Sequence, residues 1–108
     1  MAPPTAERDW KYMKKVKEDL LATLCEQING QSMNILKSEA NSERERYGRL
    51  YQHVQDSDDI VADCFDDWRR STLLMKLVAL QRQGLLTSDH MQHLSEETQK
   101  RLKALKEL

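Results

Sequence analysis

Six aspartates between positions 56 and 67 are the residues best suited to chemistry: Asp56, Asp58, Asp59, Asp63, Asp66 and Asp67. Asp59, Asp63 and Asp67 recur at steps of four, which places them on one face of a helix. Aligned carboxylates can hold Mg²⁺ or Ca²⁺. They also suit a solvated face that pairs with lysines, and this second interpretation is the one that we favour.

Two histidines, His90 and His93, form an i, i+3 pair next to Asp89. Two imidazoles on one helix face can bind a transition metal, but the sequence shows no third ligand. We therefore interpret them as polar surface residues near the start of a helix. Di-iron bundles use Glu-x-x-His on two helices, and no glutamate of this chain precedes a histidine by three residues.

Nucleophilic and phosphate chemistry have no support in the sequence. It contains no glycine-rich phosphate loop, and its serines, histidines and aspartates are scattered along predicted helices. The net charge of −1 supplies no excess of basic charge to neutralise nucleic-acid phosphates. We predict a protein that is not an enzyme and that takes no cofactor or small-molecule substrate, with nucleic acid a disfavoured partner.

The elements that must position these residues are helices. No proline follows Pro4, and proline ends helices by removing an N–H donor, so long helices can form. With 39% hydrophobic and 32% charged residues, the composition is typical of a helical or coiled-coil protein. We predict one all-α domain over residues 1–108, with a disordered tail at 1–4, a helical hairpin at 5–83 and a C-terminal helical cap at 84–108.

The first helix is predicted over residues 6–39. Thr5 can cap it, and Glu7 and Asp9 lie in the first turn, where the helix dipole favours anions. Apolar residues recur at steps of three and four, and they include Trp10, Met13, Val16, Leu20, Leu24, Ile28 and Ile35. The stripe continues past Gly30, so we expect the helix to accommodate that glycine at a cost of about 1 kcal/mol.

The second helix is predicted over residues 43–83. Ser42 and Glu45 form a capping box before it, and Gly84 ends it. Two heptad series run along it: one holds Tyr47, Val54, Val61, Trp68 and Met75, and the other holds Leu50, Ser57, Cys64, Ser71 and Val78. Because the heptad phase survives Asp56–Asp59, we expect the helix to be continuous through that segment.

Two short helices are predicted after Gly84. Thr87 or Ser88 can cap the first, over residues 88–94, and Ser95 can begin the second, over residues 96–107. Their few apolar side chains can cover only part of the hairpin: Met91, Leu94, Leu102 and Leu105.

A short turn makes the two long helices antiparallel neighbours. This arrangement sets the lysines of residues 11–17 near Asp63, Asp66 and Asp67, with which they can pair. It also separates Cys25 from Cys64 by about 10 Å along the helix axis, beyond the reach of a disulfide. We expect both cysteines to be reduced core residues.

Leu73, Leu77 and Leu80 form a second apolar face at i, i+4 and i+7, off the main stripe. A helix with two apolar faces must be covered on both. The cover is either the C-terminal cap or another chain. We predict that these leucines, with Trp10 near the same end, contact a partner, and that the chain is a homodimer or has a stable protein partner.

The function that we predict is non-catalytic: a module for protein–protein interaction or assembly that acts through amphipathic helix faces. The sequence has no apolar run long enough to cross a membrane and no apolar signal segment at its N-terminus. We therefore expect a cytoplasmic protein.

Two alternatives come from other functional classes. The first is a DNA-binding regulator in which residues 86–105 form a helix-turn-helix-like unit. The side chains that would enter the major groove are Thr98, Gln99, Lys100 and Arg101. Glu96 and Glu97 oppose this alternative, because they would repel phosphate at the start of the recognition helix. The second alternative is a helical metal-binding protein that uses the aspartates or the histidine pair.

Overall fold

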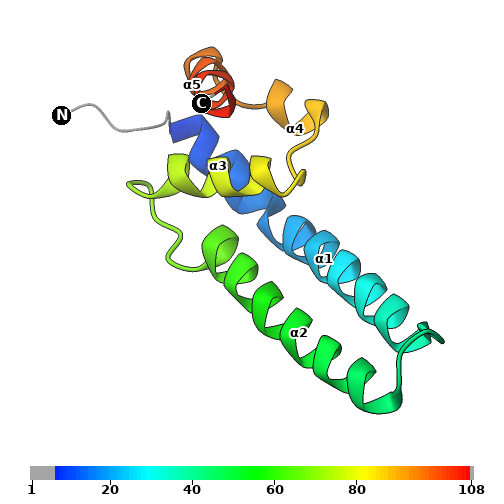
Figure 1. Ribbon diagram of the computed structural model, residues 1–108. Coiled ribbons are helices and arrows are strands. Elements are labelled where there is room, and N and C mark those ends of the chain that lie inside the picture. The colour runs from blue at the N-terminus through cyan, green and yellow to red at the C-terminus, as the bar shows by residue number, and fades with distance from the viewer. Residues whose placement is uncertain (1–6, 108) are drawn as a thin grey trace.

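Every element of residues 7–107, which the computed structural model describes, is a helix. In order, these are α1 (Glu7–Lys37), α2 (Glu43–Phe65), α3 (Leu73–Arg82), α4 (Ser88–Gln92) and α5 (Glu96–Lys106) (Figure 1). The all-α prediction is confirmed. The predicted tail at 1–4 and the predicted cap Thr5 lie outside the described residues.

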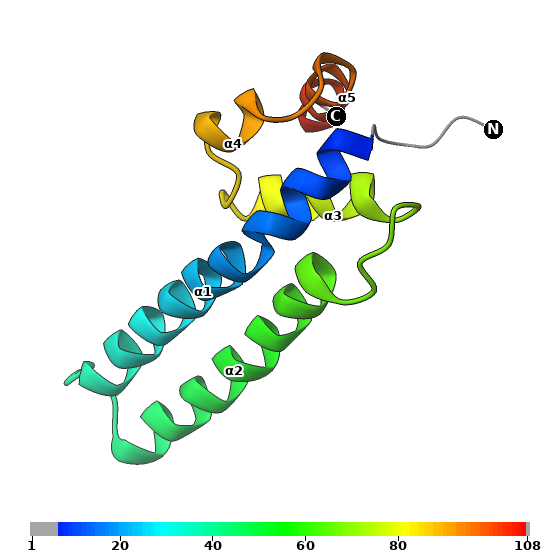
Figure 2. The ribbon, with the colours of Figure 1, turned by 180° about the vertical axis from the view of Figure 1, so that it is seen from behind.

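The molecule is elongated, at 55 × 27 × 24 Å along its principal axes. α1 and α2 form an antiparallel hairpin, and α3, α4 and α5 gather around the N-terminal half of α1 (Figure 2). The hairpin turn and the C-terminal helices therefore occupy opposite ends of the molecule.

The long first helix is confirmed by α1, which also contains Gly30. A Cβ atom added at Gly30 would meet open space, so no close contact requires a glycine at this position. The buried residues of α1 all lie in its N-terminal part: Asp9, Trp10, Met13, Leu20 and Leu24. Toward the hairpin turn, α2 is the one element of residues 7–107 that lies beside the apolar stripe of α1 (Figure 1).

Side chains close the turn between α1 and α2. The Arg46 guanidinium donates from Nη1 to the Ser38 carbonyl oxygen at 2.6 Å. Ser42 Oγ accepts from the Glu45 amide at 3.2 Å, and the Glu45 carboxylate accepts from the Ser42 amide at 3.2 Å. The predicted capping box is confirmed, and it satisfies amides that the first turn of a helix leaves unpaired.

The second helix is not continuous to residue 83, so that part of the prediction is wrong. Asp56–Asp59 is helical, as expected, but α2 ends at Phe65 and α3 begins only at Leu73, after the seven-residue loop 66–72. A loop of this length spans one heptad, so it leaves the hydrophobic phase unchanged on its far side. The heptad pattern therefore cannot distinguish this break from a continuous helix.

Local hydrogen bonds stabilise the loop 66–72. Asp67 adopts a φ of 57°, in the left-handed region that aspartate tolerates better than most residues. The Trp68 indole Nε1 donates to the Cys64 carbonyl oxygen at 2.7 Å, and Thr72 Oγ1 donates to the Asp67 carbonyl oxygen at 2.7 Å. The chain thereby changes direction, and α3 crosses α1 instead of extending α2 (Figure 2).

The core lies where α3 meets α1 and the C-terminal segment. Leu73, Leu77 and Leu80 of α3 are all 0% exposed. The same cluster contains further side chains from α1, α2, α5 and the connecting segments: Trp10, Met13, Leu20, Leu24, Cys64, Phe65, Leu85, Leu94 and Leu102. Full burial of a leucine stabilises a fold by about 1.5–3 kcal/mol, so this end carries most of the hydrophobic stabilisation.

The structure differs from the predicted hairpin in two details. Cys25 is exposed and Cys64 is buried, because Cys25 follows the buried Leu24 by one residue and so points about 100° away from it. The expected ion pairs between the lysines of α1 and the aspartates at the end of α2 do not occur among residues 7–107. Lys17 lies instead over the Trp68 ring, with Nζ 4.9 Å from the ring centroid.

Both C-terminal helices begin at predicted caps. Thr87 Oγ1 accepts from the His90 amide at 3.3 Å, and Ser95 Oγ accepts from the Thr98 amide at 3.3 Å. The predicted stop at Gly84 is also confirmed, with α3 ending at Arg82. Gly84 has a φ of 71°, a conformation that glycine adopts without strain.

Candidate interaction surface

Large exposed apolar side chains gather at the turn end of the hairpin. Five of the seven found among residues 7–107 belong to the last turns of α1 and the first half of α2: Met33 (54% exposed), Leu36 (51%), Tyr47 (69%), Tyr51 (57%) and Val54 (45%). Soluble proteins rarely leave a contiguous apolar surface open to water without a binding role.

Side chains that reach between the helices mark the contact line of the hairpin. His53 Nε2 lies 3.1 Å from the Ile28 carbonyl oxygen, and Arg46 binds the Ser38 carbonyl oxygen. Ser57, one turn beyond His53 on the same face of α2, is 6% exposed. These residues define which face of each helix is turned toward the other.

The exposed apolar residues share one side of the hairpin. At about 100° per residue, Tyr47, Tyr51 and Val54 lie between a fifth and just over a third of a turn from the contact face of α2. Leu36 lies a similar rotation, in the same sense, from the contact face of α1. Two antiparallel helices that lie in one plane are related by a two-fold axis normal to that plane. Residues rotated by the same angle, in the same sense, from the two contact faces therefore lie on the same side of the plane. Met33 lies farther around α1, toward the face that points away from α2, and it borders the same side.

The opposite side of the hairpin is polar. It carries exposed residues from both helices: Gln27, Asn34, Arg49, Gln52 and Asp56. The Gln52 amide donates from Nε2 to Asp56 Oδ1 at 2.9 Å, so these groups are partly paired on the surface. The hairpin as a whole is therefore amphipathic. We call the side formed by Met33, Leu36, Tyr47, Tyr51 and Val54 its apolar side.

The residues that the sequence predicts as partner contacts are covered by the chain itself. Leu73, Leu77 and Leu80 are fully buried, and Trp10 is 9% exposed. The C-terminal helices cover the second apolar face of α3. Of the two covers that the sequence allowed, the C-terminal cap and another chain, the structure shows the first. These residues belong to the core, and most of the large exposed apolar side chains lie at the other end of the molecule.

Charged groups surround the covered Trp10. Lys14 Nζ lies 5.6 Å from the centroid of its ring, and the Arg70 guanidinium carbon lies 5.4 Å from it. Arg70 also donates to both carboxylate oxygens of Glu7 at 2.9 Å. This hydrogen-bonded pairing lowers the pKa of Glu7 and raises the pKa of Arg70. Through these contacts, Arg70 holds the loop 66–72 against the start of α1.

The candidate metal ligands either make other contacts or are not grouped closely enough to share a metal ion. His90 Nδ1 accepts from the Thr87 amide at 3.0 Å, completing the capping box of α4. His93 stacks on the Tyr12 ring at a centroid distance of 4.6 Å, and burial raises the pKa of Tyr12. Among residues 7–107, no group of three or more His, Cys, Asp or Glu side chains is placed to hold a metal ion.

The helix-turn-helix-like segment does not present the side chains that would read DNA. Thr98 is 1% exposed, and the Gln99 amide donates to the Leu94 carbonyl oxygen at 2.9 Å. Arg101 pairs with the Glu97 carboxylate at 2.8 Å. Of the four proposed recognition residues, Lys100 alone is exposed, while Gln99 and Arg101 are half-buried.

Asp9 has a structural role that sequence reasoning missed. Its carboxylate is 0% exposed and accepts from the Ser95 amide at 2.7 Å, from Ser95 Oγ at 2.8 Å and from Thr98 Oγ1 at 2.7 Å. The carboxylate thus binds the N-terminus of α5, where the helix dipole favours an anion. The acidic first turn of α1 was the only signal, and it pointed to the dipole of α1 itself.

None of the helices within residues 7–107 combines the length and the hydropathy that crossing a membrane requires. Comparison with protein-family models, with curated proteins and with solved structures finds no match to this chain.

Proposed function

We propose that this protein is a non-catalytic module for protein–protein assembly, and that the apolar side of the hairpin binds a second copy of the chain. The observation that carries the proposal is the exposure of Met33, Leu36, Tyr47, Tyr51 and Val54 on one side of two packed helices. Two such sides packed together form a four-helix bundle, a common way to cover amphipathic helices.

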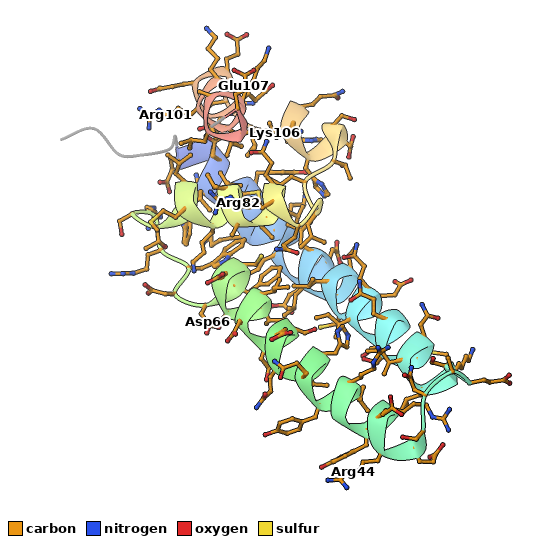
Figure 3. All side chains as sticks on the ribbon, viewed as in Figure 1. Arg44, Asp66, Arg82, Arg101, Lys106 and Glu107 are labelled. Carbon is orange, nitrogen blue, oxygen red and sulfur yellow. The ribbon has the colours of Figure 1, made fainter. Side chains whose placement is uncertain are left out.

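Charge on α2 supports a second copy as the partner. Arg44 and Asp58 lie seven residues before and seven residues after Tyr51, so all three share one face of α2. Antiparallel pairing of two α2 helices about a two-fold axis at Tyr51 sets Arg44 of one copy against Asp58 of the other, twice. Figure 3 shows Arg44 pointing away from the body of the molecule at the start of α2. Within the described residues, Arg44 and Asp58 form no ion pair of their own.

The tyrosines suit a face that alternates between water and a protein partner. A tyrosine ring supplies a large apolar contact, while its hydroxyl can remain hydrated at the rim of an interface. Tyr47 and Tyr51 are the most exposed of the five residues on the apolar side. Their rings would contribute the largest part of the area buried between two copies.

A cytoplasmic location suits this proposal. Cys25 and Cys64 are both free thiols, one exposed and one buried. Burial raises the pKa of Cys64 and keeps it protonated. A reducing compartment preserves an exposed thiol such as Cys25, which an oxidising one would pair between copies.

Light scattering over a wide concentration range tests the proposal. We expect the wild-type chain to have the mass of a dimer. The variant Tyr47→Ser/Tyr51→Ser is expected to have the mass of a monomer, because it removes two large apolar contacts per copy without opening the core. Met75→Ser serves as the matched control, since Met75 is 73% exposed on α3, far from the hairpin turn. A wild-type monomer at every concentration contradicts self-association.

A further inference from the structure

A groove crosses α3 at the end of the molecule that lies away from the hairpin turn. It consists of three hollows of about 760, 480 and 320 Å³. Gln81 and Lys106 line both the first and the third hollow, and Val78, Arg82 and Leu105 line both the second and the third. The hollows therefore adjoin one another, in a row from the C-terminal end of α2, across α3, to α4 and α5.

The floor of this groove is apolar. Met75 and Leu105 are 73% and 37% exposed, and they are the two large exposed apolar residues that lie off the hairpin. Half-buried apolar side chains continue the floor between them and α4: Leu74, Val78, Leu86 and Met91. Methionines adapt their shape to a contacting surface, which favours docking of an apolar partner.

The rim of the groove is basic. It carries Lys76, Arg82, Lys100, Lys103 and Lys106 but only two acidic residues, Asp63 and Glu96. Figure 3 shows Arg82 on α3 and Lys106 on α5, the two cations that border the third hollow.

Most of these rim cations have no partner among the residues that the structure describes. Lys76 donates from Nζ to the Asp63 carbonyl oxygen at 2.9 Å. Within residues 7–107, Arg82, Lys100, Lys103 and Lys106 form neither an ion pair nor a hydrogen bond through their side chains. This local excess of positive charge contrasts with the net charge of −1 on the whole chain.

We infer that this groove binds an amphipathic helix of a partner protein whose apolar face is flanked by acidic side chains. An apolar floor between basic rims matches such a helix in both hydropathy and charge. α3 has ten residues and is about 15 Å long, enough to contact about three turns of a bound helix. Nucleic acid fits less well, because its phosphates would use the rim but leave Met75, Leu105 and the rest of the floor uncovered.

This site is separate from the apolar side of the hairpin and does not depend on self-association. The two surfaces lie at opposite ends of the molecule and share no residue.

Fluorescence anisotropy with synthetic peptides tests this inference. The probe is a labelled peptide of about 20 residues in which leucines recur at helical spacing between flanking glutamates, a length that can hold a helix. We expect this peptide to bind the full chain, and to bind more weakly as the salt concentration rises from about 0.05 M to about 0.5 M. A peptide of the same composition but scrambled order, and one with lysines replacing the glutamates, are expected to bind at least about tenfold more weakly.

Two protein variants locate the bound peptide. Lys100→Gln/Lys103→Gln/Lys106→Gln is expected to raise the Kd by about tenfold, because each exposed ion pair contributes up to about 1 kcal/mol. The matched control, Lys11→Gln/Lys15→Gln/Arg49→Gln, removes the same charge from exposed positions outside the groove and outside the apolar side of the hairpin. It is expected to bind like the wild type. Thermal unfolding followed by circular dichroism checks that both variants fold.

Five results overturn the inference. The acidic peptide does not bind at all. The scrambled or the basic peptide binds as well as the acidic peptide. The groove variant and the control lose the same affinity, which shows general charge attraction. Tyr47→Ser/Tyr51→Ser abolishes peptide binding, which places the peptide on the hairpin. Finally, a labelled DNA duplex binds in preference to the acidic peptide, which identifies the rim as a nucleic-acid site.

Discussion

At the scale of single residues, Asp9 joins the first helix to the last. A buried carboxylate is costly unless it is hydrogen-bonded, and this one accepts three hydrogen bonds from Ser95 and Thr98. Arg8 adds a neighbouring contact by donating to the carbonyl oxygen of His93, the C-cap residue of α4, at 3.3 Å. These contacts hold α5 in place over the core, and α5 supplies one wall of the groove.

Substitution of Asp9 tests this role. Asp9→Ala leaves buried donors of Ser95 and Thr98 without an acceptor, so we expect it to lower the free energy of unfolding by about 2–4 kcal/mol. Urea unfolding at matched protein concentration measures the change. Asp19→Ala, at an exposed position of the same helix, is the control and should stay within about 0.5 kcal/mol of the wild type. Equal losses in the two variants would show that the Asp9 network contributes nothing specific.

Sequence reasoning could not find the Asp9 network, because its partners lie 86 and 89 residues away along the chain. Capping residues are different, since each acts on an amide within its own turn. That is why Ser42, Thr87 and Ser95 could be assigned from sequence alone. The partner role predicted for Leu73, Leu77 and Leu80 depended on what covers them, which is again a long-range property.

At the scale of elements, the ends of helices were more predictable than the break between two of them. The starts of α2, α4 and α5 follow local capping chemistry. The loop 66–72 spans one heptad, so the period of apolar residues gives no sign of it. An aspartate pair followed by Trp68 lets the chain turn, but the same residues are also compatible with a helix.

The capping box of α2 predicts how that helix responds to acid. Hydrogen bonds from the Ser42 backbone and side chain lower the pKa of Glu45 below its ordinary value of 4.5. A lowered folded-state pKa stabilises the fold above pH 4.5, and this contribution is lost as the pH falls through the folded-state value. The wild-type chain should therefore lose stability when the pH is lowered from neutral to below that value.

Glu45→Gln isolates this contribution. Glutamine can keep the capping box but cannot titrate, so the variant should lose less stability on acidification than the wild type. Urea unfolding at pH 7 and at about pH 3.5 measures the difference. Glu26→Gln, at an exposed position of α1, is the matched control and should keep the wild-type acid response. An unchanged acid response in Glu45→Gln would contradict the assignment.

At the scale of the whole molecule, the two ends differ in how their apolar side chains are covered. One end holds the core, formed where α1, α3 and α5 meet, and the other end is a two-helix hairpin with one apolar and one polar side. The sequence predicted that the long apolar stripe needs cover from another chain. Tyr47 and Val54 of that stripe are exposed, and their cover by another chain stays a prediction. It also expected Leu73, Leu77 and Leu80 to remain uncovered within one chain, but they are buried, because the break after Phe65 lets the chain cover them by itself.

The solution mass of four proteins, measured by sedimentation equilibrium, tests self-association through the hairpin most directly. We expect the wild-type chain to be a dimer, and Arg44→Asp and Asp58→Arg each to weaken that dimer by at least about tenfold, because each sets like charges against each other across the two-fold axis. The combined variant Arg44→Asp/Asp58→Arg reverses both charges and is expected to regain the dimer. A monomeric wild type, or a combined variant no more dimeric than the single ones, would contradict this account.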